Sequence, residues 1–115
     1  MPFERGLVYL DTQRAADAAV LFQELARNPE TSTRDAESGD TVITMIPHAH
    51  GNHFHIGRRV VMSSDATGLH NSGVWAALIR KGLARPVMPV GLALTPAGVD
   101  YETGLRDMIL HGADH

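Results

Sequence analysis

Cysteine is absent from this chain of 115 residues, which excludes disulfides, thiolate nucleophiles and zinc sites built on thiolate ligands. The sequence also lacks the run of about 18 apolar residues that a membrane-spanning helix needs, and its charged N-terminal residues are unlike a secretory signal. It contains neither a phosphate-binding loop nor a Gly-x-Ser-x-Gly nucleophile elbow. With 43% hydrophobic and 20% charged residues, the composition predicts one soluble globular domain, residues 1–115, and cytoplasmic is the default location.

Positive charge is concentrated in one part of the chain. Segment 56–89 has five basic residues and one acid, a net +4, whereas the remaining residues have 5 basic and 12 acidic side chains, a net −7. Together they give the net charge of −3. A basic island in an acidic protein favours a surface that binds a polyanion, although solvated blocks of charge are common. Its basic residues are Arg58, Arg59, Arg80, Lys81 and Arg85.

The apolar pattern of the first 40 residues predicts a strand, a helix and a loop. Residues 6–10 form a short apolar run, and residues 13–27 have the spacing of an amphipathic helix that Asp11 or Thr12 can cap. Pro29 disfavours a helical conformation in the residue before it and so ends this helix. The polar segment 29–40 predicts a mobile loop.

The segment 41–62 predicts a β-hairpin with histidines at its tip. Two apolar runs, 41–46 and 53–62, flank the turn dipeptide Gly51-Asn52. With a two-residue turn, the directly opposed histidine pairs would be about 4.5–5.5 Å apart at Cβ. These pairs are His50 with His53 and His48 with His55. The same register would place an apolar set on the core face: Ile43, Met45, Phe54, Ile56, Val60 and Met62.

Neutral imidazoles are good ligands for zinc, copper or nickel, so the four histidines are candidate ligands for zinc or another divalent transition metal. The alternative is a polar tip whose histidines are solvated or contact a partner. Hydrolytic chemistry is poorly supported, because no acid lies between Thr41 and Ser64 to act as a base.

A second and a third helix are predicted in the C-terminal half. Asn71 or Ser72 can cap a helix whose apolar stripe begins at Val74, and Gly82 suits the left-handed residue that ends it. Two prolines limit residues 83–94 to edge strands or an extended loop. Thr95 and Pro96 then start a final helix, which would bury Tyr101, Leu105, Met108 and Ile109.

The residues HNSGVWAALIRKGLARP and GLALTPAGVDYETGL resemble the second half of a bacterial winged-helix domain, as in small transcription regulators. In that family a capped helix ends in an Arg/Lys-Gly-Leu step, a two-strand wing follows, and Leu-Thr-x-x-Gly leads into a last helix. The resemblance covers the segment 71–111. It implies that the helix 72–81 lies in the major groove of DNA with Asn71 and Ser72 nearest the bases, where Asn71 could read adenine. A winged helix-turn-helix also needs a helix before the recognition helix, for which residues 63–70 offer little room.

These observations predict an α+β domain with the order strand, helix, hairpin, helix, extended pair, helix. The leading interpretation is a non-enzymatic, nucleic-acid-associated regulatory protein, dimeric like many small regulators, whose basic residues contact phosphates. A second is a small acidic inhibitor or modulator that docks on a nucleic-acid-handling complex, of a viral or mobile-element kind. A third is a metal-dependent enzyme built on the histidine hairpin, with Asp40 or Asp65 as the base.

Overall fold

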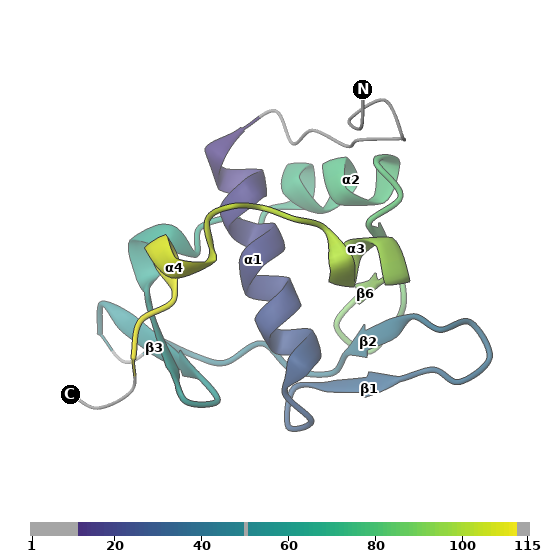
Figure 1. Ribbon diagram of the computed structural model, residues 1–115, viewed down its shortest axis with the longest axis horizontal. Helices are drawn as coiled ribbons and strands as arrows, with labels where there is room; N and C mark the ends of the chain where they lie inside the picture. Colours follow the sequence, from purple (N-terminus) through teal and green to yellow (C-terminus); the bar gives the residue numbers. More distant parts are fainter. Residues whose placement is uncertain (1–11, 50, 113–115) are drawn as a thin grey trace.

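Helix α1 (Gln13–Arg27) runs through the middle of the molecule, and the other elements surround it (Figure 1). The computed structural model describes residues 12–49 and 51–112, so the strand expected at residues 6–10 lies outside the described residues. The side chain of Thr12 accepts a hydrogen bond from the backbone N–H of Ala15 at 3.1 Å and begins α1 at the expected residue. The helix ends before Asn28, and the α+β class is confirmed.

Four short antiparallel strands form one sheet in the order β1-β2-β6-β5. They are β1 (Ser32–Arg34), β2 (Thr41–Ile43), β5 (Ala84–Arg85) and β6 (Ala93–Leu94). The extended pair predicted after the second helix is present as β5 and β6. However, β6 lies between β2 and β5, so the expectation of edge strands alone was wrong there. Both prolines, Pro86 and Pro89, lie in the connection outside the paired residues.

Strand β1 falls within the segment 29–40 that was predicted to be a mobile loop, and that prediction was wrong for residues 32–34. The hydroxyl of Thr31 donates to the carbonyl of Leu25 at 2.7 Å, and that of Ser32 donates to the carbonyl of Ala26 at 2.9 Å. These carbonyls belong to the last turn of α1, where the regular helical N–H partners are missing. The carbonyl of Leu25 also accepts from the N–H of Asn28 at 3.3 Å. The polar side chains therefore serve the helix end, while the backbone of β1 pairs with β2.

The predicted hairpin with its turn at Gly51-Asn52 is not formed. Strands β3 (His53–Ile56) and β4 (Arg59–Met62) instead form a two-stranded sheet around a turn at Gly57-Arg58. Gly57 has a φ of +58°, and a two-residue turn of type II′ places a glycine at this first central position. Residues 53–62 are thus a hairpin in themselves, and β2 pairs with β1 and β6.

This change of register also alters the core face. Ile43, Phe54 and Ile56 are buried as predicted, but Met45 is 46% exposed and Met62 is half-buried. Val60 is buried too, but it pairs with His55 and therefore lies on the face opposite Phe54. Phe54 pairs directly with Val61, which is also buried. Met62 lies opposite His53, one position out of phase with the core face.

Helix α2 (Ser72–Arg80) forms as predicted. The side chain of Asn71 accepts from the backbone N–H of Val74 at 3.0 Å, and Gly82, with a φ of +77°, follows the helix. A single turn of 3-10 helix, η2 (Ser63–Asp65), is the only helical turn between β4 and residue 71 among the described residues.

The single C-terminal helix predicted from the sequence is two short helices, α3 (Pro96–Asp100) and α4 (Arg106–Ile109). Gly104 lies between them with a φ of +72°. Glycine adopts this left-handed conformation readily, and it interrupts a regular helix. Ile109 is buried as expected, whereas Met108 is 69% exposed.

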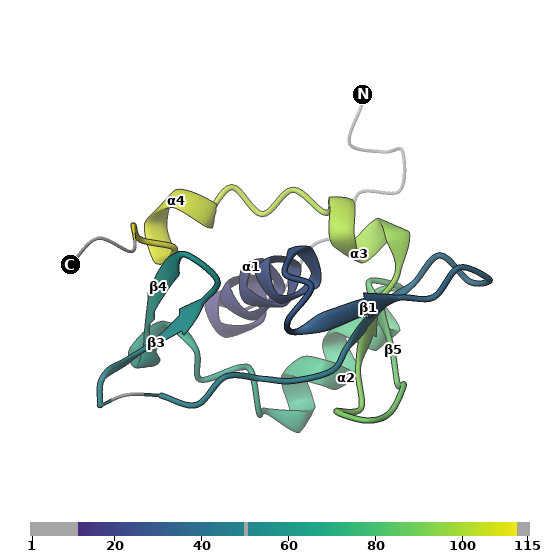
Figure 2. The ribbon, with the colours of Figure 1, turned by 90° about the horizontal axis from the view of Figure 1, so that it is seen from below.

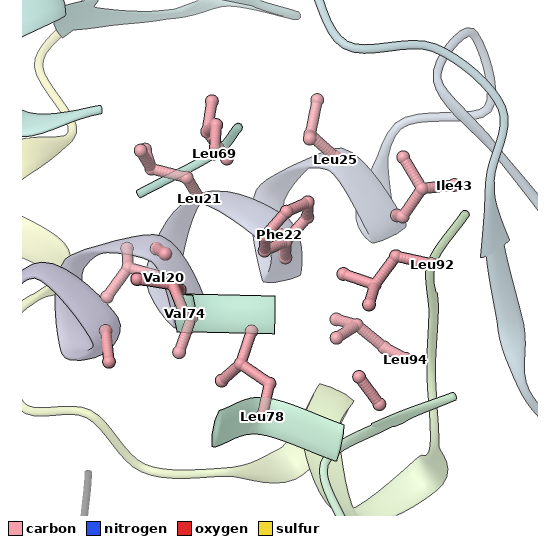
Figure 3. Packing of buried hydrophobic residues seen from close by; sticks show 14 of the residues in the cluster. Val20, Leu21, Phe22, Leu25, Ile43, Leu69, Val74, Leu78, Leu92 and Leu94 are labelled. Carbon is pink, nitrogen blue, oxygen red and sulfur yellow. The ribbon is translucent and has the colours of Figure 1, made fainter. Parts of the chain in front are cut away.

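The core forms where α1 meets α2 and the four-stranded sheet. Phe22 lies at its centre, and the side chains drawn in Figure 3 converge on it from α1, α2, β2 and β6. Seen from below, α2 lies on one side of α1, and α3 and α4 lie on the other (Figure 2). The two sheets lie at opposite ends of the long axis of the molecule. Helix α1 is therefore enclosed on its different sides by different elements.

Candidate nucleic-acid interface

A groove of about 500 Å³ lies between the first turn of α1 and the length of α2. Three cationic residues line it, and none of the described lining residues is an acid. The cationic residues are Arg14, Arg80 and Lys81, and the rest of the lining is Thr12, Ala15, Asn71, Gly73, Val74 and Ala77. A concave surface that is lined by positive charges raises the local concentration of anions.

Local sequence explains how α2 presents this groove. Val74 and Leu78 are buried against α1, while Ser72, Gly73 and Arg80 remain exposed. Arg80 and Lys81 lie at the C-terminal end of α2, where positive charge also stabilises the helix macrodipole. Their position is therefore favourable for the fold whether or not a ligand binds.

Arg14 joins these residues from α1, and the sequence analysis did not single it out. It is exposed, and its Nε donates to the hydroxyl of Thr67 at 3.0 Å, which limits the directions its guanidinium can take. Its sequence signal is only a basic residue in the first turn of an amphipathic helix. Arg14 lines the groove because α1 packs against α2, and the local sequence pattern does not predict this packing.

The exposed surface of α2 offers few groups that read base edges. The Oδ1 of Asn71 already accepts the capping hydrogen bond from Val74, and a bidentate contact to adenine needs both ends of the amide. Beyond Ser72, the exposed positions are Gly73, Ala76 and Arg80. Contacts to phosphate, which carry no sequence information, fit this surface better than base recognition does.

Arg58 and Arg59 lie at the opposite end of α1. They line a shallower pocket of about 310 Å³ with Glu24, Arg27 and Asn28. The 15 residues of α1 span roughly 22 Å, and Figure 1 shows α2 beside the first turns of this helix and the hairpin reaching toward its last turn. The five basic residues of segment 56–89 therefore do not share one surface.

Arg85 has a structural partner. Its Nε lies 2.8 Å from Oδ2 of Asp40, whose side chain is only 5% exposed, while the side chain of Arg85 is 62% exposed. The other carboxylate oxygen of Asp40 is buried and has no hydrogen-bond partner among the described residues. Arg85 thus compensates a buried negative charge, and Asp40 is held by this ion pair rather than placed beside a histidine as a base.

The histidine quartet is not assembled as predicted. His50 lies outside the described residues, and His48 lines a pocket of about 180 Å³ together with His70 and Phe54. His53 and His55 lie on the face of β3 opposite Phe54, with ring centroids 5.3 Å apart. The predicted pair of His48 with His55 was wrong, because His55 pairs with Val60 across the turn at Gly57-Arg58. Across residues 12–49 and 51–112, no three His, Cys, Asp or Glu side chains come close enough to hold a metal ion.

Comparisons of the chain with protein-family models, curated proteins and solved structures give no match. Some elements implied by the winged-helix resemblance follow in the expected order, namely α2, the β5–β6 pair and α3 after Thr95. The helix expected before the recognition helix is missing from residues 63–71, and α1 packs against α2 instead. The winged-helix assignment stays a prediction. None of the helices within the described residues has the length and apolar character of a membrane span.

Proposed function

We propose that this chain is a non-enzymatic, nucleic-acid-associated regulatory protein that holds nucleic-acid phosphates in the groove between α1 and α2. The observation that supports this proposal is the composition of the groove, with Arg14, Arg80 and Lys81 and no acid among its described lining residues. Cationic side chains on phosphates release condensed counterions, and this term supplies most of the affinity of non-specific binding.

The remainder of the chain favours binding confined to this groove. The net charge of the whole chain is −3, which opposes a general attraction to nucleic acid. The small residues on the exposed side of α2 favour weak discrimination between sequences, because few of them can donate or accept at base edges. We therefore expect modest affinity, steep salt dependence and little sequence preference.

A pair of charge-matched double variants tests this proposal. Arg80→Ala/Lys81→Ala removes two cations from the groove. Arg58→Ala/Arg59→Ala removes two cations of the β3–β4 hairpin, which lie beside the C-terminal end of α1. Fluorescence anisotropy with a labelled mixed-sequence duplex, titrated over a range of salt concentrations, measures the affinity and the salt slope of each. The groove variant should lose affinity and reduce the salt slope by about two, since each phosphate contact contributes about one.

The hairpin variant should bind like the original chain, because its two arginines do not line the groove. Equal losses in both variants would show that total charge decides binding, and would contradict a dedicated site. An original chain that does not bind at low salt would also reject the proposal.

A further inference from the structure

Two imidazoles and one thioether lie on the same face of the β3–β4 hairpin. Side chains alternate along a strand, so His53 and His55 project to the face opposite the buried Phe54 and Ile56. Met62 of β4 pairs directly with His53, and directly paired residues of an antiparallel ladder share a face. The three side chains are therefore neighbours on one surface.

The hydrogen bonds of the ladder place Met62 close to His53. The backbone N–H of Ser63 donates to the carbonyl of Asn52 at 2.8 Å, so that pair is hydrogen-bonded. Bonded and non-bonded pairs alternate, which makes His53 and Met62 a non-hydrogen-bonded pair. In such pairs the side chains approach most closely, with Cβ atoms roughly 4.5–5.5 Å apart.

Val60, on the same strand, supports this assignment. Its N–H and C=O both bond to the backbone of His111 on the other side of β4, at 3.0 and 2.9 Å. They are therefore not used toward β3, as the alternation requires for the pair of Val60 with His55.

The two imidazoles are close enough to bind one ion. Their ring centroids are 5.3 Å apart with planes at 80°, so a ring nitrogen of each can approach a common point. The Nδ1 of His53 lies 3.3 Å from Oδ1 of Asn52. In the tautomer that protonates Nδ1, this contact orients the ring and leaves the lone pair on Nε2, as outer partners of metal-binding histidines do.

We propose that His53, His55 and Met62 form a binding site for copper in the Cu(I) state. A thioether is a soft ligand that selects Cu(I), and imidazole also suits copper, whereas structural zinc sites use thiolate, imidazole and carboxylate. All three residues are half-buried, so an ion can reach them from solvent. This site differs from the histidine quartet, because it needs only two of those histidines and adds a ligand from β4.

The affinity of the purified chain for Cu(I) tests this site. Cu(I) is kept reduced with ascorbate and titrated in competition with the chromophoric chelator bicinchoninate, and zinc affinity is measured separately by calorimetry. We expect one Cu(I) per chain. His55→Ala and Met62→Leu should each weaken Cu(I) binding at least about tenfold, the lower end of what even an outer-shell partner contributes. Met62→Leu should leave any zinc affinity nearly unchanged, because leucine keeps the volume and removes only the soft ligand.

Met88→Leu is the matched control, since Met88 is 76% exposed on the β5–β6 connection and should not affect copper. X-ray absorption of the copper-loaded original chain adds a measurement that needs no variant and should show one sulfur ligand with imidazole nitrogens. The proposal is overturned if the chain does not compete for Cu(I), if Met62→Leu binds as tightly as the original, or if the spectrum contains no sulfur ligand.

Discussion

Glu24 in α1 and Arg106 in α4 form a salt bridge of 2.8 Å that joins residues 82 positions apart in the sequence. The same carboxylate oxygen also accepts from Nε of Arg106 at 3.0 Å and from Arg27 at 2.7 Å. The side chain of Glu24 is only 9% exposed. This carboxylate fastens the short C-terminal helix to the central helix.

Glu24→Ala should therefore destabilise the fold. It removes the acceptor of three N–H groups and leaves two guanidinium groups without their anion. Because both arginines are more than one-third exposed, solvent screens part of the effect, and we expect a loss of about 1–2 kcal/mol. Urea denaturation measures this value. Glu30→Ala is the control, since Glu30 is exposed and its substitution should change stability by less than about 0.5 kcal/mol.

Thr95 connects two helices through one hydroxyl group. Its Oγ1 donates to the carbonyl of Gly82 just after α2, at 2.7 Å, and accepts from the N–H of Gly98 in α3, at 3.1 Å. Thr95→Val keeps the shape but loses both bonds at a site that is 6% exposed, so we expect a loss of about 1–3 kcal/mol. Thr95→Ser should recover most of the stability in the same denaturation assay. A serine variant as unstable as the valine variant would show that the methyl group, not the hydroxyl, is what matters.

Gly98 allows α3 to lie directly against the segment after α2. A Cβ at this position would overlap the carbonyl group of Leu83, and backbone atoms cannot move aside as a flexible side chain can. Gly98→Ala should destabilise by about 1–3 kcal/mol or more, as overpacking of an interior does. Ala97→Ser, at the exposed neighbouring position, should have little effect on the midpoint of thermal unfolding. Similar midpoints for the two variants would contradict this close approach.

The first two helices were predictable because their signals are local. Thr12 and Asn71 cap α1 and α2, and Gly82 follows the end of α2, as their side chains and the periodic apolar spacing indicated. Each of these signals acts within about one helical turn. A strand has no comparable signal for its partner, because the partner can lie anywhere along the chain.

The hairpin shows how this limitation changed the candidate metal site. Gly51-Asn52 and Gly57-Arg58 are both acceptable two-residue turns by sequence, and only Gly57 has strands of matching length on both sides. Because the turn lies six residues later than predicted, the residue opposite His55 is Val60 and not His48. The later turn also brings Met62, which alternation had assigned to the core, to the histidine face.

The groove was predictable only in part. The sequence provided Arg80, Lys81 and Asn71 from α2, but Arg14 depends on how α1 lies beside α2, a relationship that includes residues more than 50 positions apart. The expectation that the basic residues of segment 56–89 form one surface was also wrong. Arg58 and Arg59 are separated from Arg80 and Lys81 by the length of α1.

Arg14→Ala tests whether this unanticipated residue belongs to the groove. If Arg14 contacts phosphate, the variant should weaken binding to a mixed-sequence duplex and reduce the salt slope by about one, uniformly across sequences. Arg34→Ala is the matched control, because Arg34 is exposed on the edge strand β1 and does not line the groove. Anisotropy titrations of both variants at several salt concentrations give the two slopes. Arg14 also donates to Thr67, so its substitution can affect stability. The denaturation midpoint of the Arg14→Ala variant should therefore be recorded in parallel. A loss of binding with an unchanged midpoint identifies a ligand contact. An unaltered slope would restrict the phosphate contacts to the C-terminal end of α2.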